Sequence, residues 1–438
     1  MFSRFTAVAA LALAPLAAAG PLTPPAGAVS PTNKTLQEVE PRIPISRANT
    51  TITEPGSYYL TNNIDMQGFS GIRVAASSVT IDLNGFTIFS TTTGGNGDCI
   101  TANFDADLQN ITIRNGKLVR PNRFQIYMLA ADNVTVEDVE FVQGTNYALS
   151  ADNGLTVRRC SFDRTSGGIL TDDRLRVEDC SFDQVQRNPI VCDNSAVIDR
   201  VEISNGPNGI RAGSGFTLRD SSMREIDGEA VSCLASSRIE NVTLDGIGSD
   251  ATDIALEVGS DSKVSSCLIR RVIGTAISAS TLATVEDTQV SGITGLGVSV
   301  SSDSAIQRCS VNSASLGAIT TGSRSVVRDS AVVIAANSIG IDVGADCEVT
   351  NCFIDAFSNT GTTGIDATLS DVRIVSNTFS DCNIAIELGA TTTSDRFVVK
   401  NSFMSCIVPI NGSGPGVALV QSGGDAFAAS AWSNIDVP

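Results

Sequence analysis

The residues best suited to chemistry in this chain are arginines and tyrosines in one early region. The chain has no histidine, which excludes any mechanism that needs imidazole as base, nucleophile or metal ligand. Tyr127 and Tyr147 each precede a stretch that ends in Ala-Asp, and the repeat set out below predicts that they occupy equivalent positions. Arginine binds carboxylates or sulfates bidentately, and tyrosine stacks on sugar rings or donates a proton. The candidate binding residues are Arg123, Tyr127, Tyr147, Arg164 and Arg187.

The same repeat predicts that Arg123, Gln143, Arg164 and Gln184 align in a neighbouring loop column, with Arg187 close by. The alternative is that all of these are ordinary surface residues on variable loops. The loop from Thr91 to Asp98 contains three glycines and is long enough to wall a groove.

Carboxylates raise a second chemical possibility. Asp172, Asp173 and Asp193 are alternative candidate metal ligands, because stacked carboxylates can hold Ca²⁺. Aspartates also recur before many predicted strands, where they usually satisfy their own local backbone instead. The sequence requires no cofactor, and Ca²⁺ is the ion that these three residues would suit.

The elements that must position these residues come from an internal repeat. An apolar anchor is followed five positions later by a second apolar residue, and from Ile113 onward successive anchors are about 20 to 25 residues apart. The anchors are Ile81, Ile113, Val136, Val157, Val177, Ile198, Leu218, Ile239, Val264, Val285, Ile306, Val327, Val349, Ile374 and Val399. Their partners are Phe86, Leu118, Phe141, Phe162, Phe182, Ile203, Met223, Leu244, Ile269, Val290, Val311, Val332, Ile354, Phe379 and Met404.

The spacing within each repeat is that of short strands. A further apolar residue two positions before many anchors gives the period of 2 typical of strands. The step of five breaks that period, so a turn separates two strands, and a third strand follows near Ile169, Ile190 or Ile210. The sequence therefore predicts an all-β solenoid of about 15 coils, with three short strands in each coil.

Two further columns follow from the same register. The position three after each anchor is small or amide-like and includes five cysteines, which we interpret as buried, stacked thiols. Outside this column, Cys382 and Cys406 lie on neighbouring predicted coils and are the best candidates for a disulfide. The positions one and two after the anchors alternate in charge, as in Asp138, Arg159 and Asp179. Such alternation fits either a charged binding surface or a ladder of opposite charges between coils, and we favour the ladder.

The N-terminus is typical of a secreted protein. Arg4, an apolar segment and a small-residue site predict a signal peptide at 1–19, followed by a linker at 20–45. We expect the solenoid over 46–412, with an N-terminal cap region at 36–64 and a C-terminal cap or tail at 413–438. A net charge of −18 argues against nucleic acid as a partner, and no segment is long enough to span a membrane. Oligomeric state stays open.

The opening stretches Ile52–Leu60 and Ser78–Ile88 resemble the first coils of secreted bacterial β-helix repeat proteins of the pectate-lyase-like superfamily. The resemblance covers roughly residues 45–412 and implies a single-stranded right-handed parallel β-helix. It says little about activity, because this fold carries lyases, hydrolases, tailspikes and adhesins. Motifs of the polygalacturonase-like and calcium-dependent pectate lyase subclasses are missing around Asp172 and Asp173.

Two functions remain as hypotheses. The first is a secreted or cell-envelope protein that binds or scaffolds polysaccharide without catalysis, which we favour because the repeat is complete and no catalytic set is recognisable. The second is a polysaccharide lyase that acts on a uronate polymer by β-elimination, with arginine or tyrosine as base. Whether the chain is an enzyme is left open by the sequence.

Overall fold

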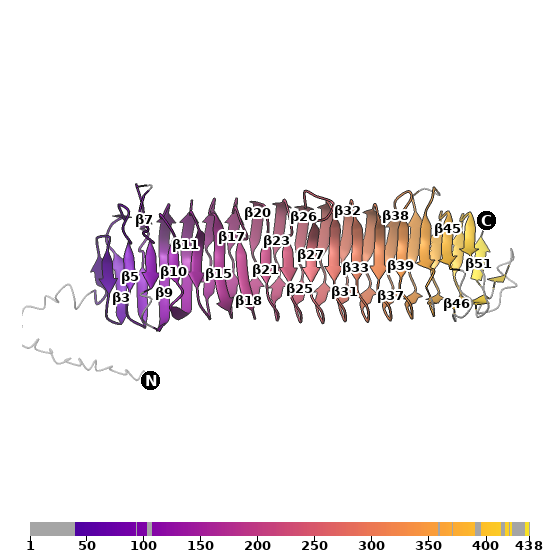
Figure 1. Ribbon diagram of the computed structural model, residues 1–438, viewed down its shortest axis with the longest axis horizontal. Coiled ribbons are helices and arrows are strands. Elements are labelled where there is room, and N and C mark those ends of the chain that lie inside the picture. Colours follow the sequence, from indigo (N-terminus) through magenta and orange to yellow (C-terminus); the bar gives the residue numbers. More distant parts are fainter. Residues whose placement is uncertain are drawn as a thin grey trace, which may run out of the picture. The chain divides into compact units, whose positions relative to one another are not determined.

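The computed structural model describes residues 40–438 apart from 93, 103–106, 358–359, 370, 390–395, 413–416, 420, 423–433 and 438. The expected signal peptide at 1–19 and the linker as far as residue 39 lie outside the described residues. Residues Arg42–Pro438 form one compact unit, and it consists of short strands that all pair in parallel with the corresponding strand of the next coil (Figure 1). Within the described ranges, no helix is long and apolar enough to cross a membrane.

Each regular coil contributes one strand to each of three columns. The first column holds β1 (Ile43–Ile45), β3 (Gly56–Leu60), β6 (Val79–Asp82), β9 (Leu108–Val119), β11 (Ala131–Val142), β13 (Thr156–Arg158), β16 (Arg176–Glu178), β19 (Val197–Asp199), β22 (Thr217–Arg219), β25 (Arg238–Glu240), β28 (Lys263–Ser265), β31 (Thr284–Glu286), β34 (Ala305–Gln307), β37 (Val326–Arg328), β40 (Glu348–Thr350), β43 (Arg373–Val375), β46 (Arg396–Val399) and β49 (Val417–Leu419).

The second column continues through the long strands β9 and β11. Its other members are β4 (Ile64–Asp65), β7 (Thr87–Phe89), β14 (Ser161–Asp163), β17 (Ser181–Asp183), β20 (Glu202–Gly206), β23 (Ser222–Ile226), β26 (Thr243–Ile247), β29 (Leu268–Val272), β32 (Gln289–Ile293), β35 (Ser310–Ala314), β38 (Ala331–Ile334), β41 (Phe353–Ala356), β44 (Thr378–Ser380), β47 (Ser402–Met404) and β51 (Asn434–Val437), with β50 (Gln421–Ser422) beside β51.

The third column is a separate sheet, which we call the third sheet. It contains β2 (Thr50–Ile52), β5 (Ile72–Val74), β8 (Ile100–Ala102), β10 (Ile126–Met128), β12 (Tyr147–Ala151), β15 (Gly167–Asp173), β18 (Ile190–Asn194), β21 (Ile210–Ala212), β24 (Val231–Cys233), β27 (Ile254–Val258), β30 (Thr275–Ala279), β33 (Leu296–Val300), β36 (Gly317–Thr321), β39 (Ile339–Val343), β42 (Thr363–Ala367), β45 (Ile384–Leu388) and β48 (Val408–Asn411).

This arrangement confirms the predicted right-handed parallel β-helix, although it has about 17 turns in place of the expected 15 or so. The extra turns come from the ends. Strands β1 to β5 precede the first anchor, Ile81, and carry no anchor with an apolar partner five positions later, so the sequence pattern did not register them.

The anchor column is confirmed over most of its length. Ile81 pairs with Ile113, Val136 with Val157, and the register continues without a shift to Ile374. The register fails at both ends. Ile374 pairs with Val398 and not Val399, and Phe379 pairs with Phe403 and not Met404. In the coil of the first anchor, Ile81, the residue Ile88 takes the place expected for Phe86, because the anchor and its partner are seven positions apart there and five apart in the next coil.

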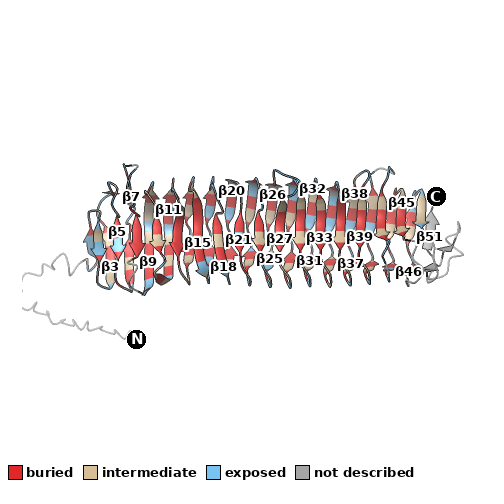
Figure 2. Cartoon of the chain, in the orientation of Figure 1, coloured by how far each residue is buried: buried red, intermediate tan, exposed pale blue. Residues whose placement is uncertain are grey.

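The anchors are buried, and so are their partners apart from Phe86 and Met404 (buried residues are red in Figure 2). Phe141, Phe162 and Phe182 are fully buried and stack with ring centroids 4.5 and 4.4 Å apart. Because each coil contacts chiefly the coils before and after it, side chains at equivalent positions stack on one another, and each column therefore contains side chains of similar size.

The charged columns form the expected ladder. Arg159 Nε lies 2.7 Å from Asp138 Oδ1, Arg200 Nε 2.6 Å from Asp179 Oδ1, and Arg308 Nε 2.7 Å from Asp287 Oδ1. All three arginines are about half exposed, so each pair adds little to stability. The prediction of a cross-coil ladder is confirmed.

All eleven cysteines are described, and all are free thiols. The stacked-thiol interpretation is confirmed for Cys160 and Cys180, since Cys180 Sγ accepts a hydrogen bond from the backbone N–H of Cys160 at 3.5 Å. The expected Cys382–Cys406 disulfide is wrong for this structure: the two thiols are hydrogen-bond partners and are not joined.

Candidate functional site

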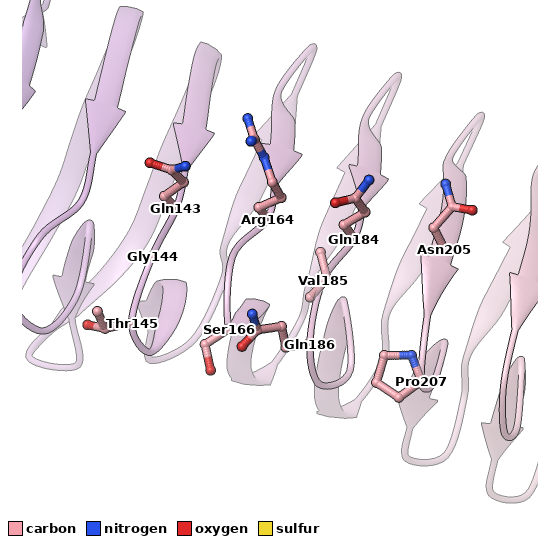
Figure 3. A pocket seen from close by; sticks show the side chains of 10 residues that line it. All are labelled: Gln143, Gly144, Thr145, Arg164, Ser166, Gln184, Val185, Gln186, Asn205 and Pro207. Atoms are coloured by element: carbon pink, nitrogen blue, oxygen red, sulfur yellow. The ribbon is translucent and has the colours of Figure 1, made fainter.

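A trough lies at the corner where the second-column strands give way to the third sheet (Figure 3). It comprises two adjoining pockets of about 800 and 860 Å³, which share Gln143 and Thr145. The first is lined by Gln143, Gly144, Thr145, Arg164, Ser166, Gln184, Val185, Gln186, Asn205 and Pro207. The second is lined by Asn63, Thr87, Phe89, Ser90, Thr91, Thr92, Val119, Arg120, Pro121, Asn122, Gln143 and Thr145.

The rim of the trough is a column of residues with left-handed backbone. Each rim residue lies two positions after a buried second-column residue, as Gln143 does after Phe141 and Arg164 after Phe162. The positive φ turns the chain sharply, so that the next residue points inward and the one after lies on the floor. The rim residues and their φ values are Arg120 (46°), Gln143 (54°), Arg164 (51°), Gln184 (53°) and Asn205 (56°).

The floor repeats in step with the rim, one residue for each coil. It is formed by Thr92, Asn122, Thr145, Ser166, Gln186 and Pro207. In Figure 3 the rim side chains of Gln143, Arg164, Gln184 and Asn205 form one row, and Thr145, Ser166, Gln186 and Pro207 form a second row. Parallel strands lie roughly 4.8 Å apart, so the trough offers similar polar groups at that interval.

The chemistry of the lining is distinctive for so acidic a chain. No aspartate or glutamate occurs among the residues that line the two pockets, although the chain has 47 acidic residues. Amides and hydroxyls predominate, with Arg120 and Arg164 as the charged groups. Amides and hydroxyls donate and accept hydrogen bonds without carrying charge, which suits a ligand rich in hydroxyl groups.

An apolar strip borders the rim at one end of the trough. Phe89, Val119 and Val142 are neighbours on successive coils, point outward from their strands and are partly buried. An exposed aromatic ring beside polar groups can stack on the apolar face of a sugar ring.

A loop bounds the trough at one end, and a pair of salt bridges bounds it at the other. At one end the loop Thr91–Asp98 is fixed by Asp65, which accepts a 2.8 Å hydrogen bond from Thr91 Oγ1, and by Asn122, whose Nδ2 donates to the Gly94 carbonyl at 3.2 Å. At the other end Arg271 bridges Glu225 and Asp245 at 3.1 and 2.6 Å, across the coil that carries Gly246. The expectation that this loop walls a groove agrees with Thr91 and Thr92 in the lining.

Arg123 does not lie in the rim column where the sequence analysis placed it; Arg120 does, because Val119 pairs with Val142. Arg123 instead holds the buried carboxylate of Asp98 through two hydrogen bonds of 3.0 and 2.7 Å. Its guanidinium also lies over the Tyr127 ring, 4.8 Å from the centroid. This pair thus anchors the end of the loop Thr91–Asp98.

The two tyrosines do not align. Tyr127 pairs with Ser150, whereas Tyr147 pairs with Gly167, so they occupy different outward columns of the third sheet. The Tyr147 ring lies over Gly167, where an added Cβ would come within 2.6 Å of it. Neither tyrosine lines the trough.

Arg164 is the predicted binding residue that lines the trough, together with Gln143 and Gln184 from the same predicted column. Arg187 is exposed and follows the floor residue Gln186, just outside the lining. The structure therefore brings Arg164 and Arg187 to the trough region and places Arg123, Tyr127 and Tyr147 beside it on the third sheet or its loop.

The three aspartates proposed for Ca²⁺ lie at the far end of the strands that follow the trough. Asp172 and Asp193 are aligned on β15 and β18, and Asp173 accepts hydrogen bonds from the backbone and side chain of Asn194. Arg187 precedes β18, so it lies at the opposite end of that strand from Asp193. Among the described residues, no group of three or more acidic or cysteine side chains has an arrangement that could hold a metal ion.

The sequence analysis missed Arg120, Asn205 and most of the floor. The signal was present, because rim residues follow the second apolar partner by two positions and floor residues follow it by four. The charge ladder follows the anchors by two positions in the same way, so the two turns of each coil obey one rule.

Comparisons with known proteins agree with the fold. A family model described as a right-handed beta helix region matches residues 54–193. No curated protein matches the chain.

Three solved structures illustrate the likeness. A tailspike protein mutant of E. coli bacteriophage HK620 in complex with a hexasaccharide is 12% identical, over 84% of this chain and 72% of that chain, with a TM-score of 0.42. The mannuronan C-5 epimerase AlgE4 A-module of Azotobacter vinelandii is 12% identical (83% and 91% covered, TM-score 0.20). PfbA, a surface adhesin of Streptococcus pneumoniae, is 11% identical (72% and 84% covered, TM-score 0.26). At these scores the likeness supports no inference about ligand or activity.

Proposed function

We propose that the protein binds an extended polysaccharide chain, which lies in the trough along the direction in which the coils stack. The observation that carries this proposal is the lining: rows of amide and hydroxyl side chains, repeated once in each coil and free of carboxylates. A polymer of hydroxyl-rich units presents its own donors and acceptors at a regular interval, so one row can serve each unit.

Binding without catalysis is the form of the proposal that the lining favours. Glycoside hydrolysis usually needs a pair of carboxylates beside the scissile bond, and none lines the trough. The lyase alternative gains nothing from Tyr127 and Tyr147, which lie outside the lining. We further propose that the protein works outside the cell or in the cell envelope, as its N-terminal sequence suggests.

A glycan array probed with the purified protein tests the proposal, with the double variant Gln143→Gly, Gln184→Gly as the critical comparison. Glycine occupies the equivalent rim positions 246 and 292, so it suits the backbone there. Each lost amide should weaken binding by roughly 1 kcal/mol, or about fivefold. Gln289→Ala, which removes an exposed glutamine from another face, should leave binding unchanged.

A protein that binds no polysaccharide on the array, or a double variant that binds as well as the parent, would refute a polysaccharide site in the trough. A parallel incubation with polyuronates, with and without Ca²⁺, tests for catalysis. New ultraviolet absorbance from unsaturated products would replace the binding proposal with the lyase alternative.

A further inference from the structure

The first four rim residues of the trough alternate in charge from coil to coil. Arg120, Gln143, Arg164 and Gln184 follow one another on successive coils, so a guanidinium recurs on every second coil, roughly 10 Å apart. The four share one backbone conformation, which gives their side chains the same starting direction. We infer that the trough selects a polysaccharide with an anionic group on every second sugar unit, an inference that rests on the proposed polysaccharide site.

Both arginines keep donors for a ligand. Arg120 uses Nε to donate to Gln143 Oε1 at 2.5 Å, and Arg164 uses Nε and Nη2 to donate to Asp163. No hydrogen bond within the described structure engages Nη1 of either residue, and both side chains are exposed. A sugar carboxylate or sulfate can therefore reach each guanidinium as a charge-assisted acceptor.

The coil of Gln143, between the two arginines, and the coil of Gln184, which follows Arg164, are unsuited to a second anion. In the coil of Gln184 the residue just before it is Asp183, whose Oδ1 accepts hydrogen bonds from Ser204 Oγ at 2.9 Å and Asn205 Nδ2 at 2.7 Å. Among the described residues no salt bridge engages this carboxylate, although its charge acts on Arg164 in the preceding coil, so it repels an anionic group placed beside Gln184. In the coil of Gln143 the preceding residue is Val142, which offers no counter-charge.

The geometry of an extended glycan fits this interval. One sugar unit advances by about one coil spacing, so alternate units meet Arg120 and Arg164, the unit between them meets Gln143, and the unit after Arg164 meets Gln184. A chain that carries an acid on every unit would place one of them beside Asp183. A neutral chain would offer no charged acceptor to the free Nη1 of either guanidinium group.

Three hexasaccharides test the inference by calorimetry: hyaluronan, which carries a carboxylate on alternate units, its carboxyl-reduced form, and oligogalacturonate, which carries one on every unit. We expect hyaluronan to bind about tenfold more tightly than either of the others. Arg120→Gln and Arg164→Gln should each remove most of that preference, and rising salt should weaken the binding of hyaluronan more than that of its reduced form.

Two further variants keep the result interpretable. Gln143→Arg should shift the preference toward oligogalacturonate, because it adds a cation to a coil without one; arginine is already accommodated at this backbone conformation on either side. Arg308→Gln removes an exposed arginine of the same conformation from the charge ladder and should change nothing.

Equal affinity for the three hexasaccharides, or a preference for oligogalacturonate in the parent protein, would overturn the inference and leave the polysaccharide site intact. Arginine variants that keep the parent's preference would also overturn it. If none of the hexasaccharides binds and the array is silent as well, the proposed function fails and the inference fails with it.

Discussion

Ser330 Oγ lies 3.1 Å from the backbone nitrogen of Cys309, one coil earlier, and accepts its hydrogen bond. The same hydroxyl donates to the backbone carbonyl of Arg328 at 2.9 Å. Ser221, Thr288 and Asn377 make the corresponding contact to the N–H of the preceding coil. The column of small residues at the first turn is therefore a chain of hydrogen-bond acceptors for buried N–H groups.

Ser330→Ala should destabilise the fold, because it leaves the buried N–H of Cys309 without its acceptor. The expected loss in unfolding free energy is about 1–3 kcal/mol, measured by chemical denaturation. Ser330→Cys should cost less, since Cys180 accepts the same bond from Cys160. An alanine variant as stable as the parent, alongside a harmful cysteine variant, would show that size and not hydrogen bonding governs this column.

Gly144→Ala should damage both the fold and the trough floor. A Cβ at this position would lie 2.7 Å from Oε1 of the buried Gln125, whose Nε2 donates to the carbonyls of Leu118 and Val142. Overpacking of this kind costs about 1–3 kcal/mol. Gly94→Ala meets no neighbour within 4 Å and serves as the matched control, with an unchanged denaturation midpoint.

Thiol reactivity should single out one cysteine. Burial raises the pKa of Cys309 and Cys352 to about 11, so little reactive thiolate forms at neutral pH. Cys406 is partly exposed, and the Cys382 thiol that donates a hydrogen bond to it lowers its pKa. We expect a thiol reagent to label Cys406 first in the folded protein.

Mass spectrometry after brief labelling identifies the modified residue. The remaining cysteines should react only once denaturant is added. Rapid labelling of Cys309 or Cys352 in the folded protein would contradict the burial on which this prediction rests.

Asp342→Asn should stabilise the protein at neutral pH. Asp342, Asp366 and Glu387 are direct neighbours on successive strands of the third sheet, and like charges placed opposite one another destabilise a sheet by roughly 0.2–1 kcal/mol. Burial raises the pKa of Asp342, and the negative charge of Asp366 adds to that rise. Removal of one charge from the row should raise the midpoint of thermal unfolding at pH 7.

The pH dependence of this effect has a definite sign. Because folding raises the pKa of Asp342, its carboxyl contributes most to stability below its unfolded pKa, and that contribution is lost as pH rises through the folded pKa. The advantage of the asparagine variant should therefore shrink as pH falls from 7 toward about 4. An advantage that grew on acidification would contradict the raised pKa. The carboxylates of the arginine ladder behave oppositely: Arg159 lowers the pKa of Asp138.

The repeat could be predicted from the sequence because each coil stacks on the one before it. Val136, Val157 and Val177 must match in size and period, so their pairing is predictable from spacing alone. The pattern failed where a coil departs from the common length, as at Ile88, and where a neighbouring apolar residue offered a false match, as Val399 did beside Val398.

Only part of the trough could be predicted from the sequence. The predicted alignment of Gln143, Arg164 and Gln184 is correct, because each lies two positions after a buried phenylalanine of the repeat. Arg123 lies 20 residues before Gln143, close to the common coil length, whereas the coil that runs from Arg120 to Gln143 has 23 residues, so spacing alone does not tell Arg120 from Arg123. Partners such as Asp98 for Arg123 arise from loop conformation, which no periodicity encodes.

Because the trough is built from repeated rows, it can evolve by duplication of coils. Gln143 with Thr145 and Arg164 with Ser166 belong to neighbouring coils that share one backbone conformation at the rim. Duplication of a single coil would insert one more rung between the loop Thr91–Asp98 and the bridge from Arg271 to Glu225, without disturbing either boundary. The length of the trough thus depends on how many coils of about 21 residues the gene encodes. Its selectivity depends on the rim side chain that each of these coils contributes.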